Sequence, residues 1–332
     1  MERFRALRVY NEDGVVSNRI ESLSLDDLSK GNLVIRSAYS SVNYKDALGA
    51  TGVGKILKTF PLNAGIDVAG TVVSSESIKY KEGDKVLVTG CGLGEEHDGG
   101  YSEYVRVPSS WAVPLPDNLS LRESMIYGTA GFTAGLCLHR LRHNGVMPEM
   151  GPVVVTGASG GVGSLSVNLL SNAGFEVIAV SGKEDQYDKL KSLGASKVVS
   201  VEGLELGSRP LEKARYAGAI DNVGGEVLEG LIRHTHLWGS IASVGLALDF
   251  KFSSTVMPFI LRGVSLLGIS STNCPYELRK NVWATLAGEL KPKDMDQFVG
   301  GQCDLDSLNH VFNSMLHRKT AGRYLVTLNK DS

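Results

Sequence analysis

The sequence predicts an α/β protein in which a doubly wound parallel sheet is joined to a second, β-rich domain. Three observations point to this fold. The chain has 332 residues, enough for about two domains of average size. Its first part consists of short alternating apolar runs between turns. Its middle part alternates strands with helices around one glycine-rich turn.

The N-terminal part, up to about residue 125, is typical of a compact, mostly antiparallel domain. Alternating runs at residues 33–37 and 85–89 predict strands, and the Lys-Glu-Gly-Asp sequence at residues 81–84 predicts a turn just before the second of them. The character of the chain then changes. Apolar residues at helical spacing predict a helix over residues 124–141.

Strands and helices alternate through the middle of the chain. The predicted strands are residues 153–156, 176–180, 197–199, 218–221, 240–244 and 264–269, and the predicted helices between them are residues 163–173, 185–193 and 227–234. Strand–helix–strand units place parallel strands side by side with helices over both faces of the sheet. This stretch therefore supplies the parallel sheet.

The C-terminal part returns to mixed character, with a helix expected over residues 276–289 and a strand over 324–328. We expect this tail to pack back onto the first domain. The predicted division is a discontinuous β-rich domain, formed by residues 1–125 and 270–332, around a second domain of residues 126–269.

Charge and composition exclude several classes of partner. The formal net charge is -2 and the basic residues are dispersed, which speaks against nucleic acid or an anionic membrane. No apolar run approaches the ~18 residues of a membrane helix, and no apolar signal segment follows the basic start, so we expect a cytoplasmic protein. The cysteines lie singly, without a CxxC pair, and are expected to be free thiols: Cys91, Cys137, Cys274 and Cys303.

The glycine-rich turn predicts a dinucleotide site. Gly157, Gly160 and Gly163 directly follow the apolar strand at residues 153–156 and precede a predicted helix. Such a turn needs glycine so that the backbone can approach a pyrophosphate, and the N-terminus of the helix offers unpaired N–H groups to the phosphates. The alternative is a glycine-rich turn without a ligand, but a second strand follows at the distance that a dinucleotide fold requires.

The end of that second strand favours NADPH over NADH. Sites for NAD usually carry an acidic residue about 20 residues after the glycine turn. Here Ser181 occupies that place, and Lys183 supplies positive charge for a 2′-phosphate. Glu184 and Asp185 are expected in the first turn of the next helix. The alternative for Lys183 is a solvated loop lysine.

Several motifs over nearly the whole length carry a resemblance to a known family. They are Asn-Tyr-Lys-Asp at 43–46, Gly-Ile-Asp-Val-Ala-Gly at 65–70, Gly-Thr-Ala-Gly-Phe-Thr-Ala at 128–134, Gly-Ala-Ser-Gly-Gly-Val-Gly at 157–163, Leu-Gly-Ala at 193–195 and Met-Pro-Phe-Ile-Leu-Arg at 257–262. With them the chain resembles the medium-chain dehydrogenase/reductase superfamily, in its zinc-free quinone oxidoreductase branch and the acrylyl-CoA reductase-like group. The resemblance implies a Rossmann NADPH-binding domain, a GroES-like catalytic domain and a homodimer.

The same resemblance implies no metal. Zinc alcohol dehydrogenases carry Gly-His-Glu where this chain has Gly-Ile-Asp, so Ile66 replaces the zinc histidine. The stretch from residue 90 to 104 holds only Cys91, whereas zinc needs three or four ligands. Two histidine pairs, His139 with His143 and His234 with His236, are expected at the surface because further ligands are missing around them.

The resemblance also implies the cofactor contacts. The pyrophosphate is expected at Ser159, Gly160, Gly161 and Val162, and the 2′-phosphate at Ser181, Gly182 and Lys183. The nicotinamide end is expected near Tyr44, Thr129, Leu246, Ile260 and Ser271, with a further contact at Arg318, where relatives often have asparagine.

Reduction of an activated alkene needs a hydride, a group that stabilises the enolate oxygen and a proton donor. Tyr44 is the candidate for a hydrogen-bond donor or acid near the nicotinamide, and its alternative role is packing against the cofactor. Asp46 is expected to cap a helix and Asp67 to serve structure. Four basic residues are considered for the phosphates of an acyl-CoA, with solvated surface charge as the default: Lys55, Lys58, Arg262 and Arg323.

Three functions follow as hypotheses. The first is an NADPH-dependent reductase of a short 2-enoyl-CoA, above all acrylyl-CoA. The second is a reductase of quinones or other α,β-unsaturated carbonyls, because the hydride chemistry is shared and specificity lies in the shape of the pocket. The third is an NADPH-binding protein without turnover. For the homodimer, the strand at residues 264–269 is a candidate edge strand that pairs with a second copy, and an internal strand is the alternative.

Overall fold

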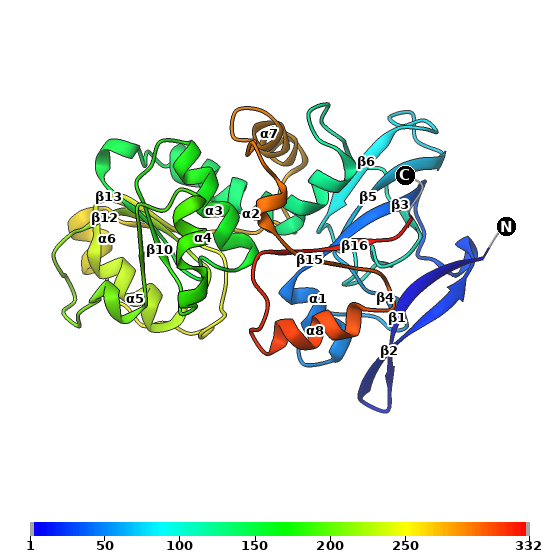
Figure 1. The fold of residues 1–332 in the computed structure, drawn as a ribbon, viewed down its shortest axis with the longest axis horizontal. Helices are drawn as coiled ribbons and strands as arrows, with labels where there is room; N and C mark the ends of the chain where they lie inside the picture. Colours follow the sequence, from blue (N-terminus) through cyan, green and yellow to red (C-terminus); the bar gives the residue numbers. More distant parts are fainter. Residues whose placement is uncertain (1–2, 330–332) are drawn as a thin grey trace. The chain divides into compact units, whose positions relative to one another are not determined.

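The computed structural model describes residues 3–329 and divides into two compact units (Figure 1). Unit 1 contains the chain up to Thr129, Thr272–Ala287 and the chain from Asp294 on, and unit 2 contains Ala130–Ser271 and Gly288–Lys293. Within the described residues, no helix is both long and apolar enough to cross a membrane.

Unit 2 is built on a six-stranded parallel sheet in the order β11-β10-β9-β12-β13-β14. Its strands are β9 (Val153–Val155), β10 (Val177–Val180), β11 (Lys197–Val199), β12 (Tyr216–Asp221), β13 (Thr235–Ser243) and β14 (Ser265–Gly268). Chain order runs outward from β9 in both directions, which is the order of doubly wound dinucleotide-binding folds. The predicted fold class is confirmed.

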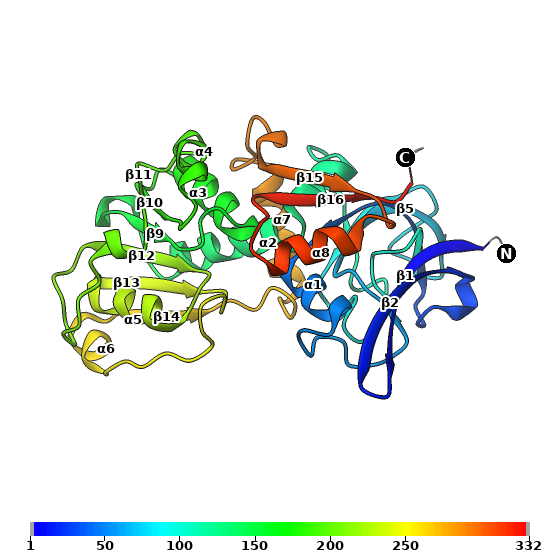
Figure 2. The same ribbon diagram turned by 60° about the horizontal axis from the view of Figure 1, so that its bottom comes forward.

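Helices cover both faces of this sheet. From the central strands the chain proceeds toward both edges of the sheet, and because each crossover is right-handed, the two directions place helices on opposite faces. They are α3 (Gly161–Asn172), α4 (Tyr187–Ser192), α5 (Gly225–His234) and α6 (Met257–Arg262) (Figure 2). The core between α5 and the sheet is formed by buried aliphatic side chains, among them Val154, Val227, Leu231 and Ile241. This packing holds the carboxyl ends of β9, β10, β12 and β13 at one edge.

Unit 1 holds two sheets. A three-stranded sheet has the order β2-β1-β4, and a larger sheet has the order β15-β16-β3-β5-β6-β8 with β7 paired to β3. The strands are β1 (Phe4–Glu12), β2 (Val15–Leu23), β3 (Leu33–Val42), β4 (Leu62–Asn63), β5 (Asp67–Ser75), β6 (Lys85–Thr89), β7 (Tyr104–Val107), β8 (Val113–Pro114), β15 (Val299–Cys303) and β16 (Arg323–Thr327). All pairs are antiparallel except β15 with β16, as predicted for a mostly antiparallel domain.

Unit 1 contains α1 (Tyr44–Thr51), α7 (Tyr276–Ala287) and α8 (Leu308–Leu316), together with the first segment of the helix that starts at Leu121. The C-terminal strand β16 pairs with β3, so the last part of the chain lies in the same sheet as the first. Pairing of Leu325 with Ser41 and of Val326 with Ser40 brings residues from both ends of the chain together. This register places Arg323 beside the start of α1, which matters for the site below.

One predicted helix differs in an informative way. The helix expected over residues 124–141 is α2 (Leu121–His143), and it is broken at Gly128, where φ is 50° and ψ is −155°. This backbone conformation is accessible to glycine alone at low cost. Helical spacing of apolar residues predicts the element but carries no signal for the break.

Candidate active site

The glycine turn in unit 2 is shaped as a dinucleotide fold requires. Gly157 has φ of 58°, and its carbonyl accepts the N–H of Gly160 at 3.0 Å. A Cβ at Gly163 would lie 2.3 Å from the Gly157 oxygen, so only glycine lets the helix start this close to the strand. Helix α3 begins at Gly161, two residues before the predicted start, and its first N–H groups have no partner within the helix. These groups form a cradle for an anion.

Two hydroxyl groups meet at the end of β10, where the adenosine ribose is expected. The Ser181 hydroxyl donates to Ser159 Oγ at 3.1 Å and accepts the N–H of Lys183 at 3.1 Å. Tyr187, the first residue of α4, donates its hydroxyl to the carbonyl of Ser181. Glu184 begins a short 3-10 turn outside this pair of hydroxyls. Burial lowers the pKa of Lys183, and the charge of Asp185 opposes this shift.

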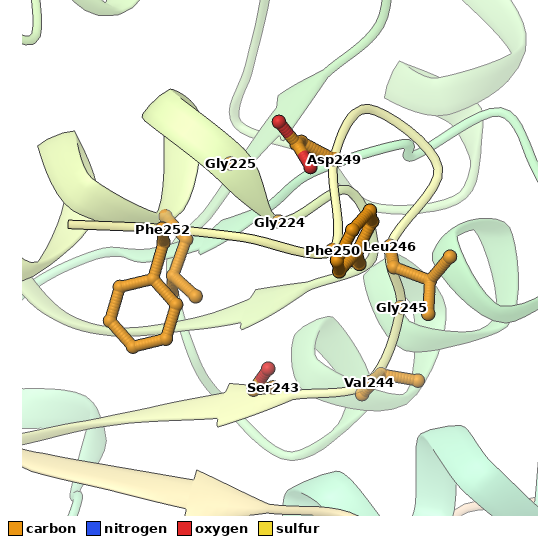
Figure 3. Close-up of a pocket in the computed structure, with 10 residues that line it drawn as sticks. Gly224, Gly225, Ser243, Val244, Gly245, Leu246, Asp249, Phe250 and Phe252 are labelled. Carbon is orange, nitrogen blue, oxygen red and sulfur yellow. The ribbon is translucent and has the colours of Figure 1, made fainter.

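A cavity of about 270 Å³ lies at the carboxyl ends of β12 and β13 (Figure 3). Its walls are the start of α5 and the segment after β13, with these lining residues: Gly224, Gly225, Leu228, Ser243, Val244, Gly245, Leu246, Asp249, Phe250 and Phe252. Leu246 is the only residue of this cavity that the sequence had placed near the nicotinamide. Ligands of open α/β sheets bind at this edge.

The neighbouring turn is held by a buried carboxylate. Asp221, the last residue of β12, accepts the Thr156 hydroxyl at 2.7 Å and the N–H of Gly224 at 2.9 Å. Burial raises the pKa of Asp221, and the two hydrogen bonds oppose the shift. The carboxylate thus ties the end of β9 to the loop that opens α5. Ile260 and Ser271 lie in the same unit but outside the cavity lining, and Ile260 is 72% exposed.

The backbone around Tyr44 in unit 1 is held in place by hydrogen bonds. It is the first residue of α1 and is 48% exposed. The helix is started by a capping box between Asn43 and Asp46, which confirms the predicted capping role of Asp46. The second carboxylate oxygen of Asp46 accepts the N–H of Ile66 at 2.9 Å. The start of α1 is therefore tied to the residue that precedes β5.

Asp67 is the centre of a buried network at the break in α2. Its Oδ2 accepts the Ser41 hydroxyl at 2.5 Å, the Asn43 amide at 2.8 Å and the Thr129 N–H at 2.9 Å. Its Oδ1 accepts the Thr129 hydroxyl at 2.5 Å. Asp67 is fully buried, and its predicted structural role is explained by these four donors.

Arg323 supplies the positive charge of this network. Its guanidinium donates to the Ile126 carbonyl at 3.0 Å, to Asn43 Oδ1 at 3.2 Å and to Ser41 Oγ at 2.7 Å. It is 2% exposed. The expectation of a surface cation for an acyl-CoA phosphate is therefore wrong for Arg323, because every direction of its guanidinium is occupied by buried protein groups.

Burial shifts the pKa values of three groups in and beside this network. Burial, and secondly the charge of Asp67, raises the pKa of Asp46 to about 7, although the N–H groups of Asn43 and Ile66 lower it. Burial also lowers the pKa of Arg323, while Asp67 and Asp46 raise it. The pKa of Tyr101, which lies beside the same carboxylates, is raised mainly by burial. The charges of two carboxylates and one guanidinium therefore act on one another in this buried site.

Two further expectations are corrected. Arg262 is half-buried and is no solvated surface cation, since its guanidinium donates to the carbonyls of Arg233 and Thr235 at the end of α5 and to the carbonyl of Glu212 before β12. His234 is buried rather than at the surface, and its ring contacts the carbonyl of Lys213. The packing around α5 determines the hydrogen bonds of Arg262 and the burial of His234. The spacing of residues in the sequence does not indicate this packing.

The remaining basic candidates, together with His139 and His143, are exposed, as expected for solvated side chains. Lys55 is exposed, and Lys58 forms an ion pair with Glu96 at 2.8 Å between partly exposed side chains. His139 and His143 are exposed on α2 with their rings stacked. Within residues 3–329, no group of three or more His, Cys, Asp or Glu side chains is arranged to hold a metal ion.

The predicted site residues divide between the units. Unit 2 brings Ser159, Ser181 and Lys183 together and places Leu246 at the cavity, whereas Tyr44, Thr129 and Arg318 belong to unit 1. Tyr44 and Thr129 are linked through Asn43 and Asp67. Arg318 is exposed after α8 with φ of 57°, a conformation that asparagine adopts more readily than most residues.

Sequence reasoning missed Ser41 and the role of Arg323 in this site. The only sequence signal for Ser41 is its place two residues before the Asn-Tyr-Lys-Asp motif. Arg323 lies in an ordinary terminal strand, 256 positions after Asp67. Only strand pairing between β16 and β3 brings Arg323 to Ser41 and Asn43.

Comparison with known proteins places the chain among dehydrogenases and reductases. The family described as alcohol dehydrogenase GroES-like domain matches residues 29–117, and the family described as zinc-binding dehydrogenase matches residues 161–288. The "Putative quinone oxidoreductase YhfP" of Bacillus subtilis is 45% identical over 98% of this chain and 99% of its own. The "Acrylyl-CoA reductase AcuI" of Ruegeria pomeroyi is 42% identical over 96% of both chains.

Solved structures agree with these relatives. The structure of Bacillus subtilis yhfP with NAD bound has a TM-score of 0.95 at 44% identity, covering 99% of this chain and 100% of the other. The structure of YHDH from Escherichia coli K-12 with bound NADPH has a TM-score of 0.94 at 44% identity, covering 98% and 100%. Matches of this extent show the family. The chain belongs to the medium-chain dehydrogenase/reductase superfamily, in its zinc-free, acrylyl-CoA reductase-like group.

Proposed function

We propose that the protein is an NADPH-dependent, zinc-independent reductase of the C=C bond of a short 2-enoyl thioester, with acrylyl-CoA as substrate and propionyl-CoA as product. The observation that carries the proposal is full-length similarity to a relative named acrylyl-CoA reductase, at 42% identity. In this proposal residues 126–269, most of which lie in unit 2, form the NADPH-binding domain. Residues 1–125 and 270–332 form the catalytic domain.

The residues of unit 2 fit the proposed cofactor. The N–H groups at the start of α3 would hold the pyrophosphate, with Ser159, Gly160, Gly161 and Val162 around it. Ser181, Gly182 and Lys183 would take the 2′-phosphate, since the strand ends in a hydroxyl and a nearby cation instead of a carboxylate. The nicotinamide half would be contacted by residues of both units: Leu246, Ile260 and Ser271 of unit 2, and Tyr44, Thr129 and Arg318 of unit 1. When bound, NADPH would supply a hydride to the β-carbon of the alkene, and a proton must then reach the α-carbon.

The chain itself must stabilise the enolate oxygen that develops on the thioester carbonyl. Tyr44 is proposed for this role because its side chain is half-exposed while its backbone is fixed by the capping box. The phenol group carries one O–H donor, which can be directed at an oxygen of the substrate. Donation by Tyr44 would stabilise the transition state more than the substrate.

The test of the function compares NADPH oxidation with acrylyl-CoA, crotonyl-CoA and a simple quinone by kcat/KM, before and after exhaustive chelation. We expect acrylyl-CoA to have the highest kcat/KM and chelation to leave it unchanged. A quinone that is reduced as well as acrylyl-CoA would instead support the second function, which the name of the Bacillus relative favours. Turnover of none of these acceptors would indicate an NADPH-binding protein without catalysis.

Lys183→Ala should weaken the binding of NADPH by about 10- to 100-fold, because a charge-assisted hydrogen bond to the 2′-phosphate is lost. Binding of NADH should change by less than about twofold, since NADH has no 2′-phosphate and a partly exposed lysine contributes little else. Titration of both nucleotides against the protein fluorescence measures this difference. It bears directly on the cofactor, because one relative was crystallised with NAD and another with NADPH. Equal losses would remove Lys183 from 2′-phosphate binding.

Tyr44→Phe should lower kcat for acrylyl-CoA by about 100-fold, the size expected when one oxyanion donor is removed. The KM for NADPH should stay nearly constant, because the phenyl ring keeps its packing. Tyr39→Phe, on β3 in the same unit, is the matched control for loss of a tyrosine hydroxyl. An unchanged kcat in Tyr44→Phe would assign Tyr44 to packing only.

We propose a cytoplasmic homodimer formed through β14. This strand is the last of its sheet and pairs only with β13 among the described strands. Large apolar side chains near it are exposed, including Trp238 at 74% and Leu261 at 56%. Two copies that join their β14 edges would cover them and continue the sheet. A monomeric mass by sedimentation at micromolar concentration would refute the dimer.

A further inference from the structure

The break in α2 leaves two helix ends inside unit 1, and each end is served by an ion of the appropriate sign. The Ile126 carbonyl, near the C-terminal end of the first segment, accepts from Arg323 at 3.0 Å. The Thr129 N–H, at the start of the second segment, donates to Asp67 at 2.9 Å. Cations stabilise the C-terminal and anions the N-terminal ends of helices. A Cβ on Gly128 would lie within 2.8 Å of atoms of Ser41, Asp67 and Arg323, so the three side chains close around the break.

Arg323 fixes the direction of the hydrogen bonds in this network, because a guanidinium only donates. Ser41 Oγ accepts from Arg323, so the Ser41 proton points to Asp67. Asn43 Oδ1 also accepts from Arg323, so its NH2 group points to Asp67. With the N–H of Thr129, Oδ2 of Asp67 receives three donors and carries no proton itself.

The remaining oxygen of Asp67 determines the role of Thr129. Oδ1 lies 2.5 Å from Thr129 Oγ1, and the Thr129 hydroxyl donates to it. A hydroxyl has one proton and two lone pairs. Since that proton is held by Asp67, the Thr129 hydroxyl can only accept a hydrogen bond from a ligand. Thr129 is half-buried, at the start of the second helical segment.

We infer that Asp67 is a positioning residue that turns Thr129 into a fixed hydrogen-bond acceptor, and that Thr129 accepts from the carboxamide N–H of the nicotinamide. The inference rests on the proposed function, which places the nicotinamide near Thr129. The inference gives Thr129 and Tyr44 different roles in hydrogen bonding. The carbonyl of an enoyl thioester offers only acceptors, so Thr129 does not serve it, and the donor for the enolate oxygen is left to Tyr44.

The test compares NADP⁺ with its 3-acetylpyridine analogue, in which a methyl group replaces the carboxamide NH2. The dissociation constants of both are measured for wild type, Thr129→Ser, Thr129→Val and Asp67→Asn, with Thr133→Val as the matched control one turn further along α2. Wild type and Thr129→Ser should prefer NADP⁺ by about 10-fold, the effect of one hydrogen bond. In Thr129→Val the ratio should fall to about one, and Thr133→Val should keep the wild-type ratio.

Asp67→Asn separates positioning from mere structural support. Its amide oxygen must face the three donors, so its NH2 faces Thr129 and donates to the hydroxyl, whose own proton is then released toward the ligand. The ratio should fall to about one although Thr129 is intact, and adding Thr129→Val should change it no further. A structural role alone would weaken both ligands equally and preserve the ratio.

The outcomes distinguish the inference from the proposed function. Wild type that binds neither nucleotide overturns both. Wild type that binds NADP⁺ without preferring it, or a Thr129→Val variant that keeps the wild-type preference, overturns the inference alone. The threonine variants suffice for this decision if Asp67→Asn does not fold.

Discussion

Arg323→Met is expected to destabilise the protein by about 3–5 kcal/mol, the cost of removing one partner from a buried ionic network. Methionine has a similar length but leaves the Ile126 carbonyl, Ser41 and Asn43 without their donor. It also leaves the carboxylates of Asp46 and Asp67 without a cation. Denaturant unfolding followed by circular dichroism measures the loss, which should appear in the midpoint and not in the slope.

The loss should depend on pH in a defined direction. Burial and Asp67 raise the pKa of Asp46 from 3.8 to about 7, so its contribution to stability is present below about pH 4 and is lost as pH rises through about 7. At pH 5 Asp46 is mostly protonated, whereas at pH 8 a larger fraction of it is ionised. Loss of the Arg323 charge should therefore destabilise the protein more at pH 8 than at pH 5.

Two further variants serve as controls for this prediction. Arg209→Met removes an exposed arginine paired with Glu212 at 2.7 Å and should cost less than about 1 kcal/mol. Arg323→Lys keeps the charge but loses the forked geometry, and should fall between wild type and Arg323→Met. A loss below about 1 kcal/mol in Arg323→Met, or one that is equal at pH 5 and pH 8, would contradict the ionic network described for unit 1.

Gly163→Ala is expected to weaken the binding of NADPH by about 100-fold or more, the equivalent of losing one or two charge-assisted hydrogen bonds. The new Cβ would lie 2.3 Å from the Gly157 oxygen and 2.6 Å from Ala158 Cα, both backbone atoms that cannot rotate away. The start of α3 must therefore move away from the turn. Its N–H groups then no longer converge on one pyrophosphate.

Gly160→Ala provides the graded control, because its Cβ would lie 3.3 Å from the same oxygen and needs only a small adjustment. Its effect on the NADPH dissociation constant should be clearly smaller. Equilibrium titration of both variants, with the melting temperature recorded in parallel, separates lost binding from lost stability. Equal dissociation constants in Gly163→Ala and wild type would refute the proposed pyrophosphate site.

The dinucleotide fold was predictable because its signals are local. The glycine spacing, the preceding apolar strand and the serine at residue 181 lie within one short stretch of the chain, and each reflects a requirement of backbone geometry or ligand charge. The strands of unit 2 accordingly follow the predicted positions closely, as with Val177–Val180 for residues 176–180. The capping role of Asp46 was predictable for the same reason, since a capping box spans only four residues.

The break in α2, the burial of Arg323 and the hydrogen bonds of Arg262 were not predictable, because they depend on partners far away in the sequence. An arginine carries the same local pattern whether its guanidinium meets water or four buried acceptors. Pairing of β16 with β3 decides this for Arg323. Packing against the end of α5 decides it for Arg262.

The sequence by itself thus determined the parallel sheet, the glycine turn and the residues that favour NADPH, since these depend on periodicity, turn geometry and charge within short stretches. Tertiary structure alone decided how Asp67, Ser41, Asn43 and Arg323 meet at the break in α2. The physical reason is that a buried charge is stable only with its partners in place, and strand pairing across the whole chain brings these partners together.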